Sequence, residues 1–155
     1  MVKARLDVGM ALITAMSRES AASVRFEPYK SLSALGGWQR ELPNEEDALC
    51  VAAGSSFVAV ATDAHSLHIL SLSGVHTVTL TLAGPPLALA GLGSTLVATW
   101  HRGSPTVDGH QCIDYMVRCQ DTDAAERSRV LDQPAVSQEM HCLLIHQAYC
   151  KAHWP

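Results

Sequence analysis

Short apolar runs separated by turn residues recur through the centre of the chain, and each run has the length of a β-strand. Gly, Ser, Asp and Pro lie between the runs, and β-branched residues and glycines leave little helical periodicity. A first series of predicted strands covers residues 48–53, 57–62, 67–72 and 75–82. A second series covers residues 87–90, 95–100, 112–119 and, more weakly, 129–131.

The second series repeats the first after roughly 40 residues, which is the length of a propeller blade. Residues 57–61 are continuously apolar, which indicates a strand buried on both faces, as between stacked blades. The pattern therefore predicts an all-β fold, an incomplete β-propeller of about two four-stranded blades with an irregular or short helical C-terminal tail. A helix is expected only within residues 140–152.

The predicted organisation has three parts: N-terminal strands or a partial blade at 1–37, a partial β-propeller at 38–131, and a divergent tail at 132–155. A ring of blades usually needs at least four. Two blades would leave unpaired strand edges and exposed apolar faces, so we expect this chain to be a truncated piece of a larger propeller.

The span from His65 to Trp100 contains no Asp, Glu, Lys or Arg and is long enough to suggest a transmembrane helix. Pro85 and Pro86 interrupt it, and residues 76–81 alternate in the manner of a strand. We therefore expect no membrane segment. The apolar stretch at 8–16 is followed by no convincing cleavage site, which argues against a signal peptide.

Composition narrows the class of protein further. With 48% hydrophobic and 17% charged residues, the chain should be globular rather than disordered. A net charge of -4 provides no basic surface for nucleic acid, so any DNA contact should be indirect or weak. Five scattered cysteines, an odd number, favour a reducing compartment over a disulfide framework.

Several motifs resemble one family in order and spacing. They are Trp-Gln-Arg-Glu-Leu-Pro-Asn-Glu-Glu-Asp at 38–47, Phe-Val-Ala-Val-Ala-Thr at 57–62, Ser-Gly-Val at 73–75, Leu-Ala-Gly-Pro at 82–85, and the segment 101–112. Together they resemble the middle β-propeller region of the replisome adaptor family, known as WD repeat and HMG-box DNA-binding protein or minichromosome loss protein. The resemblance covers approximately residues 25–131.

The resemblance implies a nuclear, chromatin-associated and non-catalytic DNA-replication adaptor. The family's propeller forms a homotrimer and links the replicative helicase to the DNA polymerase alpha-primase, which are the protein partners expected by resemblance. Family members also carry a WD-repeat propeller before this region and a helical domain after it, and the helical domain recruits client peptides. After Leu131 the sequence departs from the family, so the tail is interpreted as a retained-intron or frameshifted product.

The tail carries residue types that bind zinc: His141, Cys142, His146, Cys150 and His153. Their spacing matches no standard zinc pattern, although Cys142, His146 and Cys150 would share one face of a helix. The preferred interpretation is an unstructured or weakly packed tail without a metal.

A nucleophile and base are suggested by Cys112 and His110, with Asp108 or Asp114 to orient the imidazole. A turn at Asp108 that leads into a strand, with Cys112 as a small core residue, explains the same residues and is preferred. The segment 91–93 lacks the lysine and helix of a phosphate loop and is interpreted as a turn.

The acidic run 45–47 is interpreted as solvated charge before a strand rather than as a cation or partner site. Trp38 and Trp100 are interpreted as packing residues rather than as ligand platforms. Arg102 either caps a strand end or faces a partner. The sequence thus predicts no catalytic, cofactor-binding or metal residues, no cofactor and no enzyme.

Three hypotheses follow: the replication adaptor, a generic propeller-type interaction scaffold, and a thiol or metal-dependent enzyme motivated only by the Cys and His residues. A non-functional truncated product is a further alternative to the adaptor.

Overall fold

The computed structural model describes residues 2–5, 9–17, 20–29, 36–104, 107 and 111–120, and its regular structure is almost entirely β. The strands form three antiparallel sheets in which each strand pairs with the next along the chain. The first sheet contains β1 (Val2–Arg5), β2 (Gly9–Thr14), β3 (Ser23–Pro28) and β4 (Trp38–Glu41). The second contains β5 (Ala48–Ala53), β6 (Phe57–Thr62), β7 (Ser66–Ser71) and β8 (His76–Thr81). The third contains β9 (Pro86–Leu92), β10 (Thr95–His101) and β11 (Ile113–Cys119).

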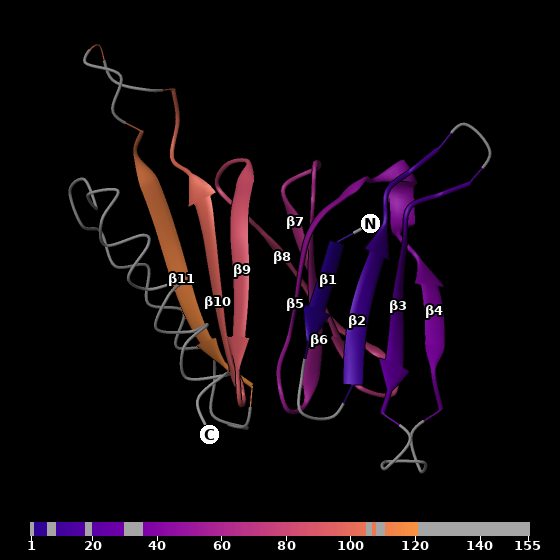
Figure 1. Ribbon diagram of the computed structural model, residues 1–155. Coiled ribbons are helices and arrows are strands. Elements are labelled where there is room, and N and C mark those ends of the chain that lie inside the picture. Colours follow the sequence, from indigo (N-terminus) through magenta and orange to yellow (C-terminus); the bar gives the residue numbers. More distant parts are fainter. Residues whose placement is uncertain are drawn as a thin grey trace.

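The three sheets stand side by side, with the second sheet between the other two (Figure 1). Strand β5 lies next to β1 and β2 on one side and next to β9 on the other. The first strand of each sheet therefore lies at the inner edge, and the later strands extend outward, as blades do around a propeller axis. The predicted fold class, an all-β incomplete propeller, is confirmed: two sheets have four strands and the third has three.

Two apolar clusters hold the sheets together. One lies between the first and second sheets and includes Ile13, Phe26 and Val60. The other lies between the second and third sheets and includes Ile69 and Trp100. Strand β6 contributes to both clusters and is buried along its whole length, which explains why its sequence does not alternate.

Local sequence explains the strand boundaries. The predicted strands at 48–53 and 57–62 coincide with β5 and β6, and the turns between strands carry Gly, Ser and Asp. Gly91 allows β9 to approach β5, because a Cβ at this position would overlap the carbonyl oxygen of Ala53.

The uncharged span from His65 to Trp100, which is long enough for a membrane helix, instead forms β7 to β10. The described part of the chain contains no helix with the length and hydropathy needed to cross a membrane.

Two predicted elements, the strand at 129–131 and the helix at 140–152, lie outside the described residues.

Candidate functional site

The carboxylate of Glu46 lies buried between the first and second sheets, just before the first strand of the second sheet. Glu46 is 8% exposed and follows the 3₁₀ turn Pro43–Glu45 that leads in from β4. It accepts a hydrogen bond from the Thr62 hydroxyl at 2.6 Å, and its Oε2 lies 2.9 Å from His68 Nε2. The Ser66 hydroxyl lies 3.4 Å from its other oxygen. A carboxylate satisfied in this way tolerates burial.

Electrostatics keep this carboxylate ionised. Burial by itself raises the pKa of Glu46, but hydrogen bonds from Thr62 and His68, the charge of His68 and a hydrogen bond from Ser66 together lower it below its ordinary value. Since Thr62 and His68 are themselves almost fully buried, the network is part of the core.

The network continues outward across β7 and β8. His68 Nδ1 lies 3.0 Å from the hydroxyl of Thr79, and this hydroxyl lies 2.9 Å from Nε2 of the exposed His76. A carboxylate, an imidazole and a hydroxyl are thus connected in series. In this arrangement the carboxylate orients the imidazole and the imidazole orients the threonine hydroxyl.

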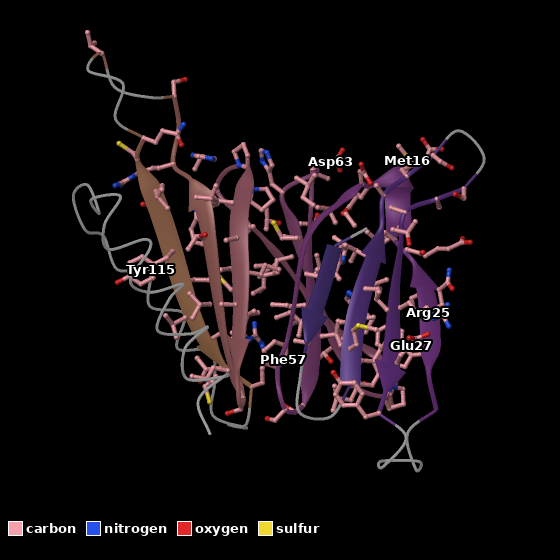
Figure 2. The ribbon with its side chains drawn as sticks, viewed as in Figure 1. Met16, Arg25, Glu27, Phe57, Asp63 and Tyr115 are labelled. Carbon is pink, nitrogen blue, oxygen red and sulfur yellow. The ribbon has the colours of Figure 1, made fainter. Side chains whose placement is uncertain are left out.

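The neighbouring Asp47 joins the two sheets directly. Its carboxylate oxygen accepts the backbone N–H of Met16, from the connection after β2, at 2.7 Å. Its own N–H donates to the Asp63 carboxylate in the turn after β6, at 2.8 Å. Met16 and Asp63 lie at the same end of the molecule (Figure 2). The Asp47 carboxylate therefore holds this end of the first sheet against the second, whereas the hydrogen bonds of Glu46 lie within the second sheet.

Trp38 joins the same two sheets through the segment that connects β7 to β8. Its indole Nε1–H donates to the carbonyl of Leu72 at 2.8 Å, and its ring packs near Phe26 with centroids 6.0 Å apart. A Cβ at Gly74 would press against the indole, and Gly74 has φ +79°. The packing role predicted for Trp38 is confirmed.

The solvated interpretation of 45–47 is wrong for Glu46. Glu45 is exposed as expected, whereas Glu46 is buried because three polar partners lie within reach of it in the folded chain. The sequence signal for this site lies in Thr62, Ser66 and His68, which place polar groups on otherwise apolar strands, and not in the acidic run itself.

The proposed nucleophile site is only partly within the described residues. His110 and Asp108 lie outside them, and Cys112 is half-buried. Asp114 faces Arg102, with 3.6 Å between the carboxylate oxygen and Nε. The backbone N–H of Arg102 donates to the carbonyl of Cys112 at 2.9 Å, and this bond closes the end of the β10–β11 pair.

The remaining candidates are structural. Gly93 has φ +56° in the tight turn between β9 and β10, which confirms the turn interpretation for Gly93, whereas Gly91 and Leu92 are the last residues of β9. Trp100 is 5% exposed and packs between the second and third sheets, as predicted. The five zinc-type residues of the tail lie outside the described residues. Within the described ranges, no group of three or more His, Cys, Asp or Glu side chains is arranged to hold a metal ion.

The polar contacts of Asp47 and Trp38 thus join the first sheet to the second, and those of Glu46 stabilise the second sheet from within.

The sequence was also compared with known proteins. It is 33% identical over 95 residues to human WD repeat and HMG-box DNA-binding protein 1, and 30% identical over 97 residues to the Xenopus laevis protein of the same name. These alignments cover 61% and 63% of this chain but only 8% of each relative, so the matched region is a small part of them.

A family comparison covers more of the chain. The family described as "Minichromosome loss protein, Mcl1, middle region" matches residues 3–141, which extends the expected resemblance at both ends. This range includes the three sheets almost entirely. With its blade-like sheets and this match, the chain belongs to the family of the minichromosome loss protein Mcl1 middle region.

Proposed function

We propose that this chain acts as a non-catalytic adaptor in DNA replication, as a piece of the propeller that organises protein contacts in its family. The observation that carries the proposal is the family match over residues 3–141. The sheets in this range are arranged like propeller blades, and polar contacts join the first sheet to the second. Residues that join the sheets in this way support a rigid platform for protein binding, rather than a site for catalytic turnover.

The proposed partners are proteins. With a net charge of -4, the chain offers no basic surface to neutralise phosphates, so contact with DNA is indirect or weak. The replicative helicase and the DNA polymerase alpha-primase are the proposed partners of the complete protein, in which the propeller forms a homotrimer. The proposed location is the nucleus.

Affinity capture tests this function. The complete protein that contains this propeller region is tagged, expressed in dividing cells and recovered from nuclear extract, and its co-purified proteins are quantified by mass spectrometry. The proposal expects helicase or polymerase alpha-primase subunits to be enriched over a tag-only control. Loss of this enrichment in a Phe57→Asp variant, which places a charge in the core between the sheets, would tie the binding to the folded blades.

The generic scaffold is the competing function, because the same blades serve many assemblies. Reproducible recovery of a different complex, with no replication subunit, would favour it and contradict the adaptor role.

A further inference from the structure

The outer edge of the second sheet is formed by β8. Within the described residues, β8 pairs with β7 alone and is the last strand of its sheet. The side chains of His76, Thr77, Thr79 and Thr81 on this strand are exposed. A strand edge of this kind carries unpaired N–H and C=O groups, which can pair with a further strand.

The backbone of β8 directs every second residue towards this edge. Leu82, directly after β8, donates its N–H to the carbonyl of His65, directly before β7, at 2.8 Å. Residues of an antiparallel strand bond alternately to the partner strand and away from it. Leu80 therefore bonds to β7 as Leu82 does, whereas Thr79 and Thr81 present both their N–H and C=O groups to the free edge.

The β8 edge lacks the features that keep strand edges from pairing with other chains. Charged side chains and proline are the usual protection, and β8 contains no Asp, Glu, Lys, Arg or Pro. The last described strands of the other two sheets do carry charges: β4 contains Arg40 and Glu41, and β11 contains Asp114 and Arg118. Of these three edges, β8 is the one suited to strand addition.

The two faces of β8 specify the side chains of an added strand. Thr79 and Thr81 lie on the face that carries the Glu46 network. Val78 and Leu80 lie on the opposite face and pack against the apolar cluster between the second and third sheets. Cross-strand pairs of two hydroxyl side chains, or of two apolar side chains, stabilise a sheet. An uncharged segment that alternates threonine or serine with valine or isoleucine therefore fits this edge.

We propose that β8 binds an extended, uncharged segment of a partner polypeptide, which adds to the second sheet as a further strand. The six residues of β8 span about 20 Å, which favours a single segment over a second copy of the chain. Each partner in a stable protein dimer buries about 800 Å², more than one short row of backbone groups offers. This binding rests on the β8 edge and does not depend on a role in replication.

NMR titration of the full chain tests the edge with a defined peptide, acetyl-Lys-Val-Thr-Val-Thr-Val-Lys-amide, in which the terminal lysines provide solubility. The backbone amides of Thr79 and Thr81 should exchange with solvent in the free chain and become protected when the peptide binds. The amide of Leu80 should be protected in both states. A control peptide that is N-methylated at its threonines lacks the N–H groups that face β8, so it should bind about tenfold more weakly.

A variant of the chain tests the same contact from the other side. Thr81→Pro removes an outward N–H without removing a bond to β7, so the sheet should persist while affinity for the peptide falls about tenfold. Thr81→Val keeps this N–H and is the matched control, with affinity close to that of the wild-type chain. Protection of the Leu80 amide reports that each variant is folded.

Three results would overturn the proposal: no protection of Thr79 and Thr81 with excess peptide, equal binding of the N-methylated peptide, or equal affinity of Thr81→Pro and Thr81→Val. The N-methylated peptide keeps the test decisive if Thr81→Pro does not fold. Protection of both amides in the free chain, together with a sedimentation mass that Thr81→Pro halves, would assign the edge to a second copy and contradict a partner segment.

Discussion

Removal of the Glu46 carboxylate should destabilise the chain more than any surface change. Glu46→Ala leaves two buried groups, the Thr62 hydroxyl and the His68 imidazole, without their acceptor. At about 1–3 kcal/mol for each buried polar group without a partner, the expected loss of unfolding free energy is about 2–6 kcal/mol. Glu46→Gln keeps one acceptor oxygen and the side-chain volume, so its expected loss is about 1–2 kcal/mol.

Urea denaturation followed by circular dichroism measures both losses. The adjacent Glu45 is the matched control, because it is exposed and Glu45→Gln removes the same charge from the same turn. The control should change the unfolding free energy by less than about 0.5 kcal/mol. If Glu45→Gln and Glu46→Gln shift the urea midpoint equally, the buried network does not stabilise the fold and the reasoning is refuted.

The same network predicts a pH dependence. The folded-state pKa of Glu46 lies below its ordinary value of 4.5, so the unfolded chain binds this proton more readily. The stability that Glu46 contributes is therefore fully present above about pH 4.5 and is lost as the pH falls through the folded-state pKa. The stability gap between the wild-type chain and Glu46→Gln should narrow below pH 4.5. A gap that stays constant down to pH 3 would contradict the lowered pKa.

Three further predictions concern packing and accessibility. Gly91→Ala should destabilise by about 3 kcal/mol or more, because its Cβ meets the Ala53 backbone, whereas Gly103→Ala meets nothing within 4 Å and should be nearly neutral in the same urea assay. Trp38→Phe should lose about 1–2 kcal/mol with the hydrogen bond to Leu72, and an unchanged midpoint would show that this bond does not hold the sheets. Burial raises the pKa of the Cys50 thiol, so iodoacetamide should modify Cys50 about tenfold more slowly than the exposed Cys119, as measured by peptide mass spectrometry; equal rates would contradict this difference.

Much of the fold could be predicted because strands carry local signals. The sequence predicts the second sheet almost residue by residue, because its apolar runs have strand length and glycine or aspartate turns separate them. For the first sheet, the sequence predicts only strands or a partial blade. In the sequence, β2 is an apolar stretch and β3 is a mixed stretch. The residues between β3 and its partner Trp38–Glu41 carry no strand signal, so the sequence does not reveal this pairing.

The polar site could not be predicted because it depends on distant pairs. Glu46 lies 16 residues from Thr62 and 22 from His68, and only the fold brings them together. On composition alone, three consecutive acidic residues indicate solvent exposure. The polar residues of β7 would have been the better guide, because His68 stands between apolar neighbours on a buried strand.

The association of the endogenous polypeptide with newly made DNA tests the central claim most directly. Proteins bound to nascent DNA are isolated from replicating cells after a short nucleoside pulse, and again after a chase that lets the labelled DNA mature. Peptides from residues 44–75 are then quantified by mass spectrometry. A replication adaptor should be enriched after the pulse and depleted after the chase, together with the replicative helicase. Equal recovery from nascent and mature DNA, or recovery only from the cytoplasm, would contradict the proposed function.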